Sequence, residues 1–216
     1  MKRCKTPYIV YVVSMAVIAV ARYTHALDQY LGTIAAVLFL YIPVMILFIK
    51  KKSPELYGLG KKGMLSGMIK AIAMVIIIFP LYSTGFYFYM KWFYHLAMTL
   101  SFIHTLSILR FAFYDLLMVA IPEEVFYRGY LQSELKRCDR KKFHFAGIEI
   151  GVSFVIVNIL FALGHLIVIQ DIARLAVFFP GLVFSWLKEK DYNISGSVTF
   201  HWLSNVLSFL LFSMLR

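Results

Sequence analysis

Long runs of apolar residues alternate with short polar segments along the whole chain. Because ~20 apolar residues span the hydrocarbon core of a bilayer as a helix, each run is a candidate membrane span. An aromatic segment at 92–105 is consistent with an interfacial helix, a re-entrant segment or part of an eighth span. The pattern predicts an all-α polytopic membrane protein, a bundle of about seven to eight transmembrane helices. The seven runs lie near Tyr8–Tyr23, Leu31–Ile49, Met64–Met90, Leu106–Tyr127, Ile148–Ile169, Ala173–Leu187 and Val198–Leu215.

Composition supports this interpretation. The 216 residues are 61% hydrophobic and 15% charged, whereas a soluble domain has about 25% charged and about 45–50% apolar residues. The net charge of +11 comes from basic residues clustered in short segments between the apolar runs. That distribution is the positive-inside pattern and not a nucleic-acid-binding face. We therefore expect a lipid bilayer, and no nucleic acid, as the partner.

Charge also predicts the orientation. With the N-terminus in the cytoplasm and an odd number of spans, 16 Lys and Arg residues fall in inner segments and 5 in outer ones. The first apolar run is predicted to be a retained helix, since no good cleavage site follows it. The small size and lack of extra domains favour a prokaryotic cell (inner) membrane. Cys4 and Cys138 lie in Lys/Arg-rich inner segments, so no disulfide is expected.

Polar side chains inside three of the apolar runs are the candidate functional residues. Ionisable groups at membrane depth cost roughly 2.5–3.5 kcal/mol on insertion scales, and they mark functional sites by default. Each group alone is compatible with interhelical hydrogen bonding, but their joint occurrence favours one shared site. The residues are Glu123, Glu124 and Arg128 in one run, His165 in the next, and His201 with Asn205 in the last.

These residue types suit hydrolysis. Glu124 and Arg128 are four residues apart and can pair, whereas Glu123 points about 100° away and is left for chemistry. A desolvated carboxylate can act as general base towards water, assisted by an imidazole. A second imidazole and a carboxamide can stabilise an oxyanion. Zinc held by two histidines and a glutamate is the alternative, but HExxH is absent and an asparagine is a poor zinc ligand, so no cofactor is expected.

The ordered motifs EExxxR, FxxxH and HxxxN on three hydrophobic helices resemble the CPBP family (CAAX protease and bacteriocin-processing, also called ABI) of intramembrane proteases. The resemblance covers roughly residues 106–215. It implies a glutamate-type peptidase without metal. It also implies roles for six residues: Glu123 and His165 activate water, His201 and Asn205 form the oxyanion site, and Glu124 and Arg128 support them.

The predicted organisation is one integral membrane unit with N-terminal helices at 1–105 and a catalytic core at 106–216. One conflict stands within it. Simple alternation of spans puts Glu123 and His201 towards the cytoplasmic half and His165 towards the outer end of its helix. A common site then requires a mid-membrane cavity or different helix boundaries. Asp115, eight residues before Glu123, is expected to have a packing or hydrogen-bonding role.

The first function hypothesis is an intramembrane endopeptidase acting near a membrane-embedded or lipid-modified substrate tail. That tail is a CAAX-type end, a peptide leader or a C-terminal sorting signal, so the partner is a membrane-tethered peptide or protein. The second hypothesis is a non-catalytic immunity or scaffold protein, or a small proton-coupled transporter using the Glu/His cluster. A transporter is expected to show repeated halves with broken helices, and the sequence shows none.

Overall fold

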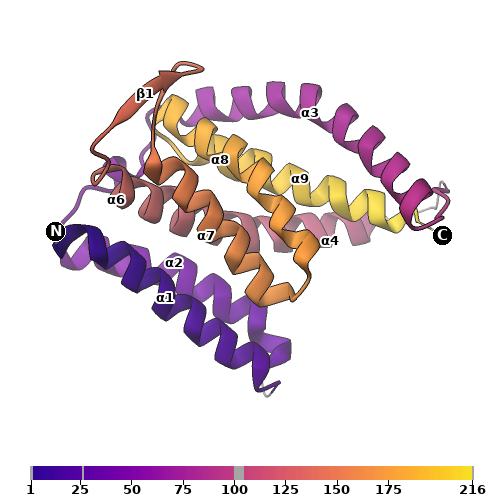
Figure 1. Ribbon diagram of the computed structural model, residues 1–216, viewed down its shortest axis with the longest axis horizontal. Helices are drawn as coiled ribbons and strands as arrows, with labels where there is room; N and C mark the ends of the chain where they lie inside the picture. The colour runs from indigo at the N-terminus through magenta and orange to yellow at the C-terminus, as the bar shows by residue number, and fades with distance from the viewer. Residues whose placement is uncertain (1, 26, 100–104, 216) are drawn as a thin grey trace.

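The computed structural model describes residues 2–25, 27–99 and 105–215, and within these ranges it is a bundle of seven long helices (Figure 1). The fourth is one continuous rod, Thr105–Lys136, which we call the glutamate helix. The other six are α1 (Lys2–Tyr23), α2 (Leu31–Ile49), α3 (Met64–Phe93), α7 (Val152–Ile169), α8 (Phe178–Asp191) and α9 (Ser195–Ser213). Each long helix coincides with one apolar run, which confirms the predicted all-α class.

Among the described residues, five helices are long and apolar enough to cross a membrane: α1, α2 with the turn before it, α3, the glutamate helix and α7. The helix α8 has only 14 residues, and α9 carries several polar residues on its inner turns. These two helices pack against each other and against α3. The chain is therefore an integral membrane protein in which α8 and α9, which are not candidate spans by length and composition, pack against the long helix α3.

Successive long helices run in opposite directions. In Figure 1 the N-terminus lies at the left end of the bundle and the C-terminus at the right end. Three connections therefore lie at the same end as the N-terminus, at 50–63, 137–151 and 192–194. The first two are basic segments that the charge count assigns to the cytoplasm, and the third follows Lys188 and Lys190 in the last turn of α8. At the opposite end, residues 94–99 contain no helix and Met98 pairs with Leu215, while 100–104 lie outside the described residues.

The glutamate helix contains two π-helical stretches between α-helical ones. It begins as α4 (Thr105–Asp115) and passes into the π-helical stretch η3 (Leu116–Ala120). It continues as α5 (Ile121–Glu124), a second π-helical stretch η4 (Val125–Gln132), and α6 (Ser133–Lys136). Pro122 has no N–H to donate to the preceding turn, and the wider π winding accommodates that loss. The two carboxylates therefore lie on a short α-helical turn between two π-helical segments.

Small residues let neighbouring helices approach closely. A Cβ added at Gly196 of α9 would lie 2.9 Å from the backbone oxygen of Gly67 in α3. A Cβ added at Gly181 of α8 would lie 2.6 Å from the side-chain oxygen of Asn158. Glycine at both positions therefore allows a close contact between helices that a larger residue would block. The core between the helices is aromatic and includes Phe126, Tyr127, Phe161, Phe184 and Phe200.

Two features of the connection after the glutamate helix differ from expectation. Cys138 forms a disulfide with Cys4, with their Cα atoms 5.9 Å apart, so the prediction of free thiols was wrong. The cause is tertiary, because the N-terminal turn of α1 packs against α6. Helix α7 begins at Val152, since residues 142–151 form a hairpin of two antiparallel strands, β1 (Lys142–Phe145) and β2 (Ile148–Gly151).

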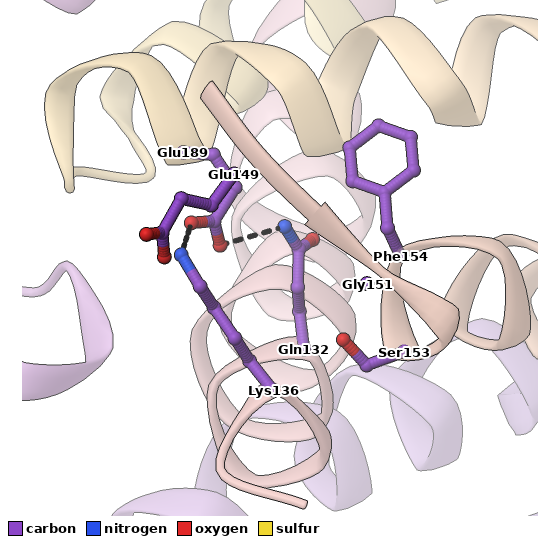
Figure 2. Close-up of a pocket in the computed structure, with 7 residues that line it drawn as sticks. All are labelled: Gln132, Lys136, Glu149, Gly151, Ser153, Phe154 and Glu189. Carbon is purple, nitrogen blue, oxygen red and sulfur yellow. Dashed lines mark hydrogen bonds and ion pairs between the residues drawn. The ribbon is translucent and has the colours of Figure 1, made fainter. Parts of the chain in front are cut away.

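An ionic cluster ties the end of the glutamate helix to α8. Figure 2 shows Lys136 and Gln132 both directed at Glu189. Lys188 also donates to this carboxylate, at 2.9 Å. Lys188 and Glu189 are buried, with 5% and 4% exposure. Buried charges need partners of opposite charge or hydrogen-bond partners. The contacts with Glu189 therefore explain how Gln132 and Lys136, which follow Tyr127 in the glutamate helix, remain packed against α8.

Candidate functional site

The carboxylate of Glu124 is the centre of a fully buried charged network. Its Oε1 accepts a hydrogen bond from Arg128 Nη1 at 3.2 Å and lies 2.9 Å from His201 Nδ1. Glu124 and Arg128 are both 0% exposed, and His201 is 3% exposed. The pairing of Glu124 with Arg128, predicted from their four-residue spacing, is confirmed. Glu124 therefore holds the side chains of Arg128 and His201 in place.

Arg128 links three helices. Its Nη2 donates to the Asn158 side chain of α7 and to the Gly181 carbonyl of α8, both at 3.2 Å. Its guanidinium lies 4.2 Å from the ring centroid of Phe161 and 4.9 Å from that of Phe184. Planar, multidentate bonding and stacking on aromatic faces are what arginine offers over lysine. Arg128 therefore fixes the helices around the site.

Glu123 lies in a different environment from Glu124. Its Oε2 is buried and has no hydrogen-bond partner among the described residues. It lies 4.0 Å from His165 Nε2 and 3.9 Å from His201 Nε2. A separation of this size between polar atoms is too long for a direct hydrogen bond and fits one bridging water. The Glu123 side chain keeps 16% exposure, so this free carboxylate is the most accessible acid of the cluster.

The surroundings of both histidines fix their tautomers. His165 Nδ1 lies 3.0 Å from the Phe161 carbonyl, which can only accept, so we assign the proton to Nδ1. His201 Nδ1 faces the Glu124 carboxylate in the same way. In the neutral rings both Nε2 atoms are then acceptors that face Glu123. Three acceptors around one gap require a proton donor such as water, or a cation, between them.

Asn205 lies one turn beyond His201 on α9, and its side-chain amide faces a third acid, Asp115. Its Nδ2 donates to both carboxylate oxygens of Asp115, at 3.1 and 3.2 Å. Asp115 is 4% exposed, which agrees with the hydrogen-bonding role expected for it. No hydrogen bond joins Asn205 to Glu123 or to either histidine among the described residues. The sequence offered one sign of this pair, since Asp115 lies eight residues before Glu123 on nearly the same stripe.

The expected conflict in membrane depth is absent because the helix boundaries differ from the predicted ones. The glutamate helix continues to Lys136, so Glu123 lies 13 residues before its end. Helix α7 begins at Val152, so His165 lies 13 residues after its start. At 1.5 Å per residue both side chains are about 20 Å from the N-terminal end of the bundle. The structure thus brings Glu123, His165 and His201 to one level.

A bound metal ion is the alternative to water for these acceptors. Three acceptor atoms from a glutamate and two histidines are a donor set that zinc uses. Within 2–25, 27–99 and 105–215, however, no group of three or more His, Cys, Asp or Glu side chains is arranged to hold a metal ion.

Comparison with known proteins adds one match. No curated protein and no solved structure matches the chain. Residues 105–207 match the family described as type II CAAX prenyl endopeptidase Rce1-like. That stretch begins with the glutamate helix and contains all six predicted site residues and Asp115. The comparison therefore shows that this part of the chain, slightly less than half of its length, is similar to the Rce1-like family.

Proposed function

We propose that the protein is an intramembrane endopeptidase that hydrolyses a peptide bond near a lipid-modified or membrane-embedded tail, with water activated by Glu123. The observation that carries the proposal is the position of Glu123 Oε2, a buried atom that has no hydrogen-bond partner among the described residues and lies about equally far from two imidazole nitrogens. The similarity of residues 105–207 to a family described as type II CAAX prenyl endopeptidase supports a C-terminal lipid-bearing tail as substrate.

The reaction begins with a water molecule between Glu123 and His165. Glu123 takes one proton as the water oxygen bonds to the carbonyl carbon of the scissile peptide, and the carbonyl oxygen becomes an oxyanion. When the C–N bond breaks, the proton held by Glu123 passes to the leaving nitrogen. The products are a carboxylic acid and an amine, so atoms and protons balance and no redox partner is needed.

His201 and Asn205 are the proposed oxyanion donors. Glu124, at 2.9 Å from His201 Nδ1, complements the positive charge on that ring when Nε2 also carries a proton. Asn205 has two amide hydrogens. Asp115, as an acceptor, turns the nitrogen side of the carboxamide inward and engages one N–H, which leaves the second to donate to an oxyanion.

Glu124 and Arg128 act as supporting residues in this proposal. Both are fully buried, and their bonds are made to protein groups on three helices. We assign the protein to a prokaryotic cell membrane with the N-terminus cytoplasmic, so the site is about 20 Å from the cytoplasmic ends of the glutamate helix and α7. A substrate tail that reaches it is therefore extended into the bilayer.

The test is cleavage of membrane-tethered tails in cells. Wild type, Glu123→Gln and Glu55→Gln are co-expressed with tagged candidate tails, and loss of each tail is followed by mass spectrometry. Glu55 is an exposed glutamate in a connection, so its substitution controls for the loss of a carboxylate alone. We expect wild type and Glu55→Gln to process a tail that Glu123→Gln leaves intact.

Three results contradict the proposal. Processing by Glu123→Gln at the wild-type rate removes Glu123 as the base. Loss of activity with a chelator, followed by recovery with zinc, replaces the metal-free mechanism with a zinc one. If well-folded protein processes no tail, the immunity or transport hypothesis takes the place of the protease.

A further inference from the structure

The hairpin of β1 and β2 presents a two-sided surface that neither the site nor the helix bundle uses. Opposed residues of an antiparallel pair share a face, and so do alternate residues of one strand. Phe143 lies opposite Ile150 and Phe145 opposite Ile148, so these four side chains form one apolar face. Lys142, His144 and Glu149 lie on the other face.

Only the inner half of the apolar face is covered by protein. The strand β2 packs against α7 and α8, and Ile148 is 4% exposed. All four residues of β1 are exposed, with Phe143 at 60% and Phe145 at 65%. The two phenylalanines therefore lie on the same face of the hairpin as the buried Ile148. They belong to the outer strand, so they extend past the helices that cover the isoleucine.

The hairpin is held across the end of the bundle and does not project from it. Its base continues directly into α7 at Val152. Its turn is fixed to α8, where Trp186 Nε1 donates to the Ala146 carbonyl at 3.2 Å and Lys190 Nζ to the Gly147 carbonyl at 3.5 Å. Figure 1 shows the strands crossing the direction of α7 at the N-terminal end of the molecule.

The surface next to the hairpin belongs to the bilayer. The exposed apolar side chains of α7 begin at Val152, which is 65% exposed and follows β2 directly. The hydrocarbon boundary thus comes close to the base of the hairpin. A phenylalanine pair directed past the edge of the bundle at this level meets lipid, and aromatic or apolar side chains flanked by cations are typical of interfacial segments.

Charge selects the kind of lipid. Arg140 and Lys141 are exposed beside β1 and have no carboxylate within ion-pair distance among the described residues, while Lys142 lies 3.8 Å from Glu149. Lys190 lies under the turn. Cations near a cytoplasmic leaflet are attracted to anionic headgroups. We propose that the hairpin is an anionic-lipid-binding element, with Phe143 and Phe145 inserted into the leaflet and Arg140, Lys141 and Lys142 at the phosphates.

The insertion is tested by placing nitroxide labels at Phe143→Cys, His144→Cys and Phe145→Cys, with the native disulfide kept oxidised. The protein is placed in nanodiscs of phosphatidylcholine and phosphatidylglycerol. Collision with oxygen relative to a water-soluble nickel chelate reports the depth of each label. We expect high ratios at 143 and 145 and a low ratio at 144. Equal, water-like ratios at all three positions overturn the proposal.

The lipid selectivity is tested by retention of phosphatidylglycerol over phosphatidylcholine in native mass spectrometry. Replacing Arg140, Lys141 and Lys142 together by glutamine is expected to lower that preference by roughly fivefold for each cation removed from the headgroup layer. The matched control replaces Lys50, Lys51 and Lys52, an equally exposed basic triplet at the same end of the bundle. Equal effects of the two triple substitutions mean that general charge, not the hairpin, selects the lipid. Neither readout depends on proteolysis.

Discussion

Replacing Glu124 by glutamine is expected to destabilise the bundle strongly, because the change removes the countercharge of Arg128. Both side chains are 0% exposed and their charged atoms are 3.2 Å apart. Removing one partner of a buried ion pair costs about 3–5 kcal/mol, since the other charge stays buried and uncompensated. For a chain of this length each kcal/mol lowers the melting temperature by about 2–4 °C. The expected fall is therefore roughly 6–20 °C.

The assay is thermal unfolding in detergent micelles, followed by intrinsic fluorescence. Glu123→Gln is the matched control, because its Oε2 has no hydrogen-bond partner to lose among the described residues, and it is expected to melt near the wild-type temperature. Arg128→Met should be as damaging as Glu124→Gln. The double variant should recover part of the loss, since neutral replacement of both members of a buried pair is often tolerated. Equal melting of Glu123→Gln and Glu124→Gln would refute the assigned division between the two acids.

Three further predictions concern other parts of the molecule. Gly181→Ala should lower stability by about 1–3 kcal/mol, because the added carbon lies 2.6 Å from a buried oxygen; Gly85→Ala, which meets nothing within 4 Å, should be neutral or slightly stabilising, and equal melting of the two variants contradicts the packing. Serine at Cys4 and Cys138 should cost about 2–4 kcal/mol, and two free thiols in denatured, unreduced wild type would show that the bond is absent. Asp115→Asn should lower kcat roughly tenfold with little change in KM, because the substitution releases the Asn205 amide that Asp115 orients. A change in KM alone contradicts this positioning role.

Much of the architecture was predictable because it depends on local composition. A helix in lipid must satisfy its own backbone hydrogen bonds, so each long apolar run predicts one helix wherever it packs. The contact between Glu124 and Arg128 was predictable for a similar reason, since residues four apart on a helix are neighbours regardless of the surroundings. The six candidate site residues were chosen from their types and order, because polar groups in apolar runs are few.

Other features were predicted wrongly or missed because they depend on distant segments. The glutamate helix extends past Tyr127 since Gln132 and Lys136 find a partner, Glu189, on another helix. An apolar run was expected to begin at Ile148, but residues 142–151 form a hairpin docked on Trp186 and the helix begins at Val152. These polar residues resemble a solvated loop in the sequence, and only their partners in the fold change that interpretation.

The sequence alone determined that this chain is a helical membrane protein and which acids and imidazoles are available for chemistry, because hydrophobic periodicity and residue type are properties of single segments. The tertiary structure decided their arrangement. It put Glu123 between two histidines, turned Asn205 to Asp115, joined Cys4 to Cys138 and left the outer edge of the hairpin uncovered. These contacts join residues far apart in the chain, and their distances are set by the packing of all seven helices together.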